Sequence, residues 1–440
     1  TISLASGNQK ANYRTSLGAT FDPGWSKFQN SQSYYFNLNA NFKPHKDWTF
    51  GIIANASYLK ERGYGDFKAL DYAKTTTRTM DPDTYYAYQY TPFNIKHELD
   101  NNYIDLGVKD VKLQLELKWK PIKGLTLALL GAYKDSGTTM ESIVTEYANR
   151  ALAFRAMQDA TVRNGNQYLW KDQDKPNSLP ETILPAGGFY NTQTRTMESY
   201  DFRASATYNT TLNNDHIINT YLGSEVNSQD RVSRWMDGWG MQYDSGLTPF
   251  WDYRAFKRLT EKNWDYYGLS KSFGRSVAFF ANATYSYKGR YTITGTTRYE
   301  GTNRLGRTRK ARWLPTWNIS GAWNAHSEDF FEKQHLLSHL TLKGSYSLVG
   351  VAPSWVTNSR AIIYSRAAWR PSAGQSENRN YIGSFENEDL TYEKKHEFNI
   401  GADLGFFNNR LNVVFDWYTR NNYDLIGPRT TNGTKGSIIE

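Results

Sequence analysis

Apolar and polar residues alternate one by one along many segments of the chain. In the strictest example, numbers 111–119, the odd positions are Val, Leu or Trp and the even positions are Lys, Gln or Glu. Successive side chains of a β-strand point to opposite faces, so each such segment predicts a strand with one apolar and one polar face. The other clear segments are 13–21, 34–42, 48–58, 125–133, 200–208, 277–287, 291–299, 340–348, 398–404 and 411–417.

The length of these segments indicates a membrane. Many of them have about 9–11 residues, which is what a tilted strand needs to cross a bilayer. Aromatic residues tend to end the apolar face, as Tyr34 and Phe42 do, while Leu, Ala, Ile and Phe lie between them. Aromatic side chains at both ends are typical of strands that meet the two membrane interfaces. We count about fourteen predicted strands in total.

The connections between these segments alternate in length. Short ones are 43–47, 121–124, 213–215, 288–289 and 408–409, and long ones are 62–107, 136–197, 229–274 and 350–389. Short turns at one end and long loops at the other are typical of bacterial outer-membrane barrels. Every backbone group in lipid must be paired, so we expect the strands to belong to a closed cylinder. The predicted fold class is therefore all-β, a transmembrane antiparallel β-barrel with long extracellular loops.

A soluble β-sandwich or a propeller also contains alternating strands, and both remain alternatives. Loops of about 40–60 residues are uncommon in compact soluble domains. No repeat of fixed length is found, which disfavours a propeller. The two classes of fold differ in one testable respect: in a sandwich the leucine-bearing faces would be buried against a second layer of protein.

Composition narrows the classes of function. The 440 residues include 52 Lys+Arg and 43 Asp+Glu, a formal charge of +9, but no block of like charges that would indicate nucleic-acid binding. There is no Cys, which excludes disulfides, Cys-ligated metals and thiol nucleophiles. The mean hydropathy of -0.70 and the lack of a long apolar run exclude a helical membrane protein. The first residues do not form a leader segment, and we expect the chain to be an internal piece of a longer protein.

Several ordered motifs resemble one family of transporters. Residues 390–394 (LTYEK), followed by 398–406 (FNIGADLGF), 408–411 (NNRL) and 416–418 (DWY), are similar to a signature of the SusC/RagA-type TonB-dependent outer-membrane transporters. Glu388 stands where that family usually has Pro, and Tyr392 where it usually has Trp. Further matches are 285–291 with 298–306, 313–315 with 321–323, and 340–350, so the resemblance covers about 276–422 best.

The resemblance implies an architecture and partners. The family has a barrel of about 22 strands whose lumen holds a plug. We therefore expect residues 1–440 to be a partial barrel domain, with the plug domain and the C-terminal strands absent from the chain. The resemblance also implies a bacterial outer-membrane location, a SusD-like surface lipoprotein as partner, and energy from TonB through a segment absent here.

Catalytic and metal chemistry is not indicated. No Ser–His–Asp arrangement or pair of catalytic carboxylates can be argued, and we expect no enzyme activity. The seven His residues are scattered, and we expect neither a metal site nor a cofactor. Acidic and amide groups at 81–83 and 213–215 fit ordinary turns better than calcium sites.

Two long loops concentrate aromatic residues. Because rings stack on sugars and on peptide side chains, these residues are candidate substrate contacts, although the pattern favours rings that fill the small cores of the loops themselves. A partly helical pattern at 140–157 could likewise pack on a partner or on the loops. The candidate residues are Trp235, Trp239, Tyr243, Trp251, Tyr253, Trp355 and Trp369.

Three functional hypotheses follow. The first is a TonB-dependent active importer of oligomeric nutrients, either glycans or peptides, in contact with outer-membrane lipid and a SusD-like lipoprotein. The second is a structural or adhesive outer-membrane barrel that binds protein partners through its long loops. The third is a soluble lectin-like β-protein.

Overall fold

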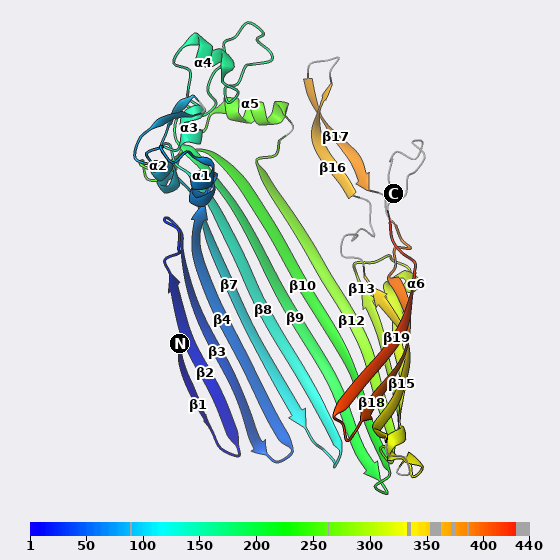
Figure 1. Cartoon of the computed structure of the whole chain (residues 1–440). Helices are drawn as coiled ribbons and strands as arrows, with labels where there is room; N and C mark the ends of the chain where they lie inside the picture. The colour runs from blue at the N-terminus through cyan, green and yellow to red at the C-terminus, as the bar shows by residue number, and fades with distance from the viewer. Residues whose placement is uncertain are drawn as a thin grey trace.

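The structure is a computed structural model that describes residues 1–88, 90–262, 264–331, 336–352, 362–370, 375–384 and 387–427. Antiparallel strands dominate it (Figure 1). The strands of the main sheet are β1 (Ile2–Gly7), β2 (Ala11–Asp22), β3 (Asn30–His45), β4 (Trp48–Tyr64), β7 (Asn102–Trp119), β8 (Leu125–Val144), β9 (Gly188–Leu212), β10 (His216–Gln242), β11 (Thr248–Pro249), β12 (Tyr267–Tyr287), β13 (Tyr291–Thr302), β14 (Trp313–Asn324), β15 (Leu337–Val351), β18 (Glu393–Phe406) and β19 (Leu411–Tyr423).

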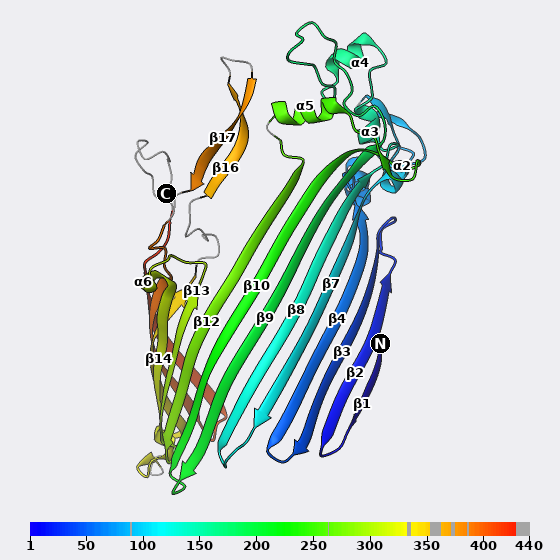
Figure 2. The ribbon, with the colours of Figure 1, turned by 180° about the vertical axis from the view of Figure 1, so that it is seen from behind.

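The main sheet follows the order of the chain. Its path is β1-β2-β3-β4-β7-β8-β9-β10-β12-β13-β14-β15-β18-β19, with β11 paired to β10 beside it. Two small hairpins stand apart, β5 (Tyr86–Tyr88) with β6 (Thr91–Phe93), and β16 (Ile362–Arg370) with β17 (Gln375–Ser384). The sheet is strongly curved, as the two opposite views show (Figures 1 and 2). Along this path each strand pairs antiparallel with the strand that follows it in the sheet, and the order in the sheet is the order in the chain. This arrangement is the antiparallel meander of a barrel wall.

Helices are short and lie in the connections. They are α1 (Ala69–Thr75), α2 (Ile95–Asn101), α3 (Asn149–Ala153), α4 (Ala160–Gly165), α5 (Tyr253–Glu261), α6 (Arg309–Arg312) and the 3₁₀ turn η1 (Ala325–Ser327). None of the helices described has the length and apolarity that crossing a bilayer takes.

The pairing register joins the apolar positions into one continuous face. Leu38 pairs with Ala54, Ala54 with Leu113, and Leu113 with Tyr133, and the same parity continues to β19. We call this the outer face and the opposite, polar side the inner face, as in a transmembrane barrel. Large outer-face side chains remain open to the surroundings: Leu17 is 59% exposed, and Leu222 is 50% exposed. No second layer of described residues covers them, so the alternation predicted the outer face correctly and the sandwich alternative was wrong.

Turns and loops segregate to opposite ends of the sheet. The connections β3–β4, β7–β8, β9–β10, β12–β13 and β18–β19 are short and lie together at one end, which we call the turn end (Figure 1). In the β9–β10 turn, Asn213 and Asn214 both have positive φ, 50° and 61°. Tight hairpin turns require positive φ at their central residues, and Asn tolerates this conformation well. The predicted alternation of connection lengths is confirmed for the described part of the chain; much of the predicted connection 350–389 lies outside it.

Several strands extend well past the predicted segments. β9 has 25 residues and β10 has 27, so the connections predicted at 136–197 and 229–274 shrink to 145–187 and 243–266. The extra residues form backbone ladders between polar side chains, for example Arg195 opposite Ser233. Alternation of hydropathy ends where the apolar face ends, whereas backbone pairing does not depend on an apolar face.

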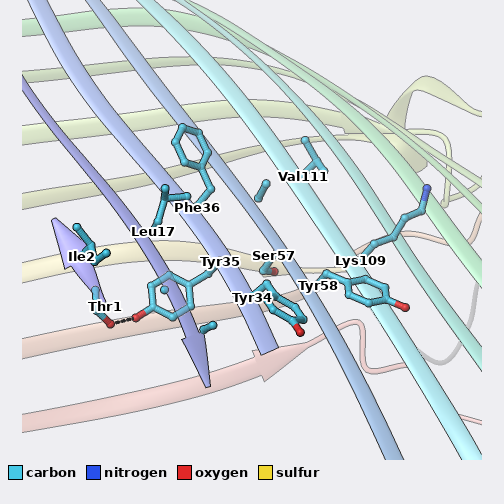
Figure 3. Close-up of a pocket in the computed structure, with 13 residues that line it drawn as sticks. Thr1, Ile2, Leu17, Tyr34, Tyr35, Phe36, Ser57, Tyr58, Lys109 and Val111 are labelled. Atoms are coloured by element: carbon cyan, nitrogen blue, oxygen red, sulfur yellow. Dashed lines mark hydrogen bonds between the residues drawn. The ribbon is translucent and has the colours of Figure 1, made fainter. Parts of the chain in front are cut away.

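A shallow hollow of about 770 Å³ lies where the sheet starts. It is lined mainly by outer-face residues of β1–β4 and β7, with the Thr1 hydroxyl hydrogen-bonded to that of Tyr35 (Figure 3). The aromatic rings of Tyr34 and Phe36 belong to this wall. β1 is the first strand of the sheet, so this hollow lies at a sheet edge.

Candidate functional site

The long connections pack together at the end of the sheet opposite the turns. We call residues 65–101, 145–187 and 243–266 the loop cluster; both views show it above β4 and β7–β10 (Figures 1 and 2). Because three separate connections contribute to it, its position is fixed by contacts among them as well as by the strands. Its larger apolar core contains Val144, Ala148, Ala151, Phe154, Trp170, Ile183, Leu184, Phe189 and Ala255, with Tyr168 and Trp239 packed against it.

A buried carboxylate joins three parts of the loop cluster. Glu98 of α2 is 1% exposed; its Oε1 accepts a hydrogen bond from Asn102 Nδ2 at 2.9 Å and its Oε2 accepts one from the backbone N–H of Asn149 at 2.8 Å. Burial raises the pKa of Glu98, and the two hydrogen bonds offset part of that shift. The same carboxylate thus holds α2, the start of β7 and the start of α3 together.

A second polar junction lies between the connections 145–187 and 243–266. The Arg155 guanidinium donates to the carbonyls of Leu184 at 3.0 Å and of Glu146 at 3.1 Å, and burial lowers its pKa. The Glu146 carboxylate accepts the backbone N–H groups of Tyr243 and Asp244, at 3.2 and 3.1 Å. These bonds satisfy backbone groups of the connections that have no partner in a strand ladder.

Helix α5 is fastened along one side. Asp252 caps it by accepting from the Arg254 N–H at 2.8 Å, and the Arg254 guanidinium pairs with Glu181 at 2.7 Å. Lys257 pairs with Asp172 at 2.5 Å and with Asp174 at 2.6 Å, and the bond to Asp172 is the main reason that its pKa is raised. The buried residues of the helix are Ala255, Arg258 and Leu259, whereas Phe256 is only half-buried.

Phe256 belongs to a row of four rings, of which Trp251, Tyr266 and Tyr267 are exposed. Trp251 stacks on Phe256 with ring centroids 5.7 Å apart, Phe256 meets Tyr266 at 5.3 Å, and Tyr266 meets Tyr267 at 5.1 Å. We call these four residues the aromatic strip. Trp251 is 58% exposed and Tyr267 is 63% exposed. A strip of accessible ring faces suits sugar rings or apolar peptide side chains.

A pocket of about 630 Å³ opens within the first long connection, between α1 and the β5–β6 hairpin. We call it the loop pocket. Its aromatic wall includes Tyr72 and Phe93, whose rings are 5.7 Å apart, and Tyr88, whose ring is 5.2 Å from that of Phe93. Asp66 and Asp71 add carboxylates to the lining. Rings beside acidic groups suit ligands with hydroxyl or amino groups on an apolar frame.

The structure separates the predicted contact residues into different environments. Trp251 and Tyr253 are exposed on or beside α5, and Tyr253 is 74% exposed. Trp239 is half-buried, with its ring 5.0 Å from that of Phe189 in the core of the loop cluster. Tyr243 is also half-buried; its hydroxyl donates to the carbonyl of Phe189 at 2.7 Å, and burial raises its pKa.

The other three predicted residues lie elsewhere. Trp235 is a half-buried inner-face residue of β10 whose indole lies against Gly268 of β12. Trp369 belongs to β16, of which the structure describes the backbone, and Trp355 lies outside the described residues. The loop pocket was missed by the sequence prediction. The available signal was the seven aromatic residues from Phe67 to Phe93, but the residues between them follow no regular pattern.

The predicted helical pattern at 140–157 is partly present. Residues 149–153 form α3, while 140–144 belong to β8. Ala151 and Ala153 are fully buried, so this segment packs on the loop cluster itself. The open choice between a partner and self-packing is thereby decided for the helical part.

Charged residues of the inner face pair with one another across neighbouring strands. Glu225 of β10 accepts from the Arg203 Nε of β9 at 3.0 Å and from the Arg298 Nη2 of β13 at 3.2 Å, and Arg298 also pairs with Glu300 at 2.6 Å. Both guanidinium groups lie 5.9 Å from the centroid of the Phe280 ring. The inner face therefore has a polar surface whose charges are largely matched.

Within the described ranges, no group of three or more His, Asp or Glu residues is placed to hold a metal ion. Asp81 is occupied by its own turn, since Oδ1 accepts from the Asp83 N–H at 3.0 Å and Oδ2 from the Thr84 hydroxyl at 2.8 Å. Hydrogen bonds to the ionised form lower the pKa of Asp81.

Comparison with known proteins supports the resemblance seen in the motifs. No family model matches the chain. TonB-dependent receptor P39 of Formosa agariphila is 23% identical over 434 residues, covering 97% of this chain and 37% of that receptor. TonB-dependent receptor SusC of Bacteroides thetaiotaomicron is 27% identical over 153 residues, covering 34% of this chain and 15% of that receptor. The expected resemblance to SusC/RagA-type TonB-dependent receptors is confirmed.

Solved structures show the same fold. The RagAB peptide importer in its closed-closed state matches 100% of this chain with a TM-score of 0.74 at 19% identity, and the chain covers 45% of that structure. The RagAB peptide transporter matches with a TM-score of 0.71, also at 19% identity. The chain thus has the fold of a transmembrane β-barrel wall and spans less than half the length of the relatives it matches.

Proposed function

We propose that this chain is part of the barrel wall of an outer-membrane importer of oligomeric nutrients, glycans or peptides, driven by TonB and working with a SusD-like lipoprotein. The observation that carries the proposal is the wall itself: a continuous apolar outer face, a polar inner face, and a structured loop cluster at one end only. In this orientation the turn end faces the periplasm and the loop cluster faces the outside. The names of the relatives, TonB-dependent receptors and a peptide importer, agree with it.

The aromatic strip and the loop pocket are the proposed first contacts for the nutrient. Both lie at the outer end of the wall, and both offer ring faces to a ligand. Trp251 and Tyr253 remain proposed contacts because they are exposed. Trp239 and Tyr243 are better assigned to the core of the loop cluster, where they position the neighbouring segments.

The full-length protein tests this proposal. We would delete its gene in the native bacterium, measure uptake of a panel of labelled oligosaccharides and peptides, and repeat the measurement with TonB removed. The expected result is loss of uptake for one class of compound in both strains. Uptake that persists without TonB, or a deletion that alters only adhesion to surfaces or proteins, would refute the importer and favour an adhesive barrel.

Single substitutions locate the contacts. Trp251→Ala and Tyr72→Ala should each weaken binding of the imported compound by about two- to twelvefold, the value of one aromatic contact. Phe330→Ala is the matched control, since Phe330 is 59% exposed but lies at the turn end. Equal affinities in all three variants would show that neither the aromatic strip nor the loop pocket touches the compound.

A further inference from the structure

A groove of about 660 Å³ runs across the outer face from β4 and β7 to β12. Its floor consists of the small residues Ala204, Ala206 and Ser224, which adjoin one another on β9 and β10. Larger side chains stand on both sides, among them Leu129, 46% exposed, and Phe279, 52% exposed. Ordinary contact with membrane lipid does not require a groove of this kind on the outer face.

The groove rises from the turn end toward the middle of the wall. It begins at Trp119, the last residue of β7, and ends at Phe279, which lies eight residues before the end of β12 at Tyr287. Eight residues rise about 26 Å along a strand, or about 19 Å along the membrane normal at the usual tilt of about 45°. One leaflet of hydrocarbon is about 15 Å thick, so the groove spans the depth of a single acyl chain.

The foot of the groove carries polar donors. The indoles of Trp48 and Trp119 are stacked, with centroids 5.3 Å apart and planes 12° from parallel. Neither indole N–H has a hydrogen-bond partner among the described residues. Tryptophan at this level of a membrane protein typically donates to the interfacial groups of lipids.

Four lysines lie in or next to the two turns that flank Trp48 and Trp119. Lys43 lies near the end of β3, Lys46 lies in the β3–β4 connection, and Lys120 and Lys123 lie in the β7–β8 connection. The two connections are adjacent, since the Lys120 N–H donates to the carbonyl of Asp47 at 2.8 Å. All four lysines are exposed, and none forms an ion pair within the part of the chain that the structure describes. Asp47 is the one carboxylate in these turns, so their net charge is positive, and a positive surface next to an apolar groove is complementary to a lipid with an anionic headgroup.

We propose that the groove binds one anionic phospholipid of the periplasmic leaflet, with an acyl chain over Ala204, Ala206 and Ser224 and the phosphate against the lysines. The proposal rests on the membrane orientation given under the proposed function, but it does not depend on what the protein imports. The site would anchor this sector of the wall to a particular lipid, whereas ordinary boundary lipid exchanges freely.

The test uses the full-length protein, purified in detergent and freed of lipid. Phosphatidylglycerol and, separately, zwitterionic phosphatidylethanolamine are added, and native mass spectrometry counts the bound molecules. Each lysine near a membrane surface contributes about fivefold in affinity, so Lys120→Gln with Lys123→Gln should weaken binding of phosphatidylglycerol roughly 25-fold. Ala206→Phe should abolish the tight site for phosphatidylglycerol, because the ring fills the floor of the groove.

Two controls match these changes. Ala402→Phe places the same ring on the outer face of β18, away from the groove, and Lys288→Gln with Arg410→Gln removes two charges from other short connections. Both should bind phosphatidylglycerol like the unmodified protein. Equal binding of the two lipids, or unchanged binding in the Ala206 variant, would overturn the site. Uptake assays are independent: tight lipid binding without uptake would leave this inference standing and remove the proposed function.

Discussion

A charge introduced on either face of one strand tests which side of the wall meets lipid. Leu113 lies on the outer face of β7, is 41% exposed, and is six residues from the turn end at Trp119. Six residues correspond to about 14 Å of height at the usual tilt, close to the bilayer midplane. Leu113→Arg should therefore cost about 2–4 kcal/mol of folding free energy, whereas Gln114→Arg on the inner face should cost less than about 1 kcal/mol.

The assay is reversible unfolding of the full-length protein in lipid vesicles, with the free energy taken from denaturant titration. A cost of 2–4 kcal/mol changes the folding equilibrium roughly 30- to 900-fold, well outside the error of the method. Leu113 pairs with Ala54 and Tyr133, so neither neighbouring position supplies a carboxylate that could offset the new charge. Equal costs for the two variants, or a greater cost at Gln114, would refute the assignment of the faces.

Further predictions concern the loop cluster. Burial raises the pKa of Glu98, so this group stabilises the loop cluster most at a pH below the ordinary pKa of a glutamate. Its contribution to stability is lost as the pH rises through the raised pKa. Glu98→Gln should therefore flatten the pH dependence of stability, as measured by amide hydrogen exchange of residues 94–102. Lys257→Gln should speed exchange across α5 because both its carboxylate contacts are lost, and Lys171→Gln, also in the cluster, should not. Trp239→Ala should destabilise the cluster by about 3 kcal/mol, measured by local exchange, whereas Trp251→Ala should leave exchange unchanged and affect binding only.

Sequence patterns predicted the wall well because the wall obeys one simple rule. Wherever a strand is in contact with lipid, its hydropathy must alternate, and the register then aligns apolar positions from strand to strand. The same rule explains the errors in strand length. Arg195 and Ser233 pair in the extensions of β9 and β10 although neither is apolar, so no alternation of hydropathy marks these residues as strand.

The loop cluster was less predictable because an aromatic side chain can either fill a core or face solvent. Trp239 and Trp251 lie twelve residues apart in one aromatic-rich segment, yet one packs on Phe189 and the other is exposed. The difference depends on residues distant in the chain: the core around Trp239 comes from 144–189, and Trp251 is displaced from it by the contacts that fasten α5. A single sequence contains no periodic signal for such contacts.

The pairing of charges on the inner face has a consequence for transport under the proposed function. Glu225 is shared by Arg203 and Arg298, so this part of the inner face is polar without presenting an unmatched charge. A wall of this kind can be hydrated and can meet a passing oligomer through many weak contacts, whereas a strong charge site would retain the oligomer. The exposed rings are at the outer end, on the aromatic strip and in the loop pocket. Under the proposed function, the imported oligomer is therefore bound first by exposed rings at the outer end of the wall. It then passes a hydrated inner face with matched charges.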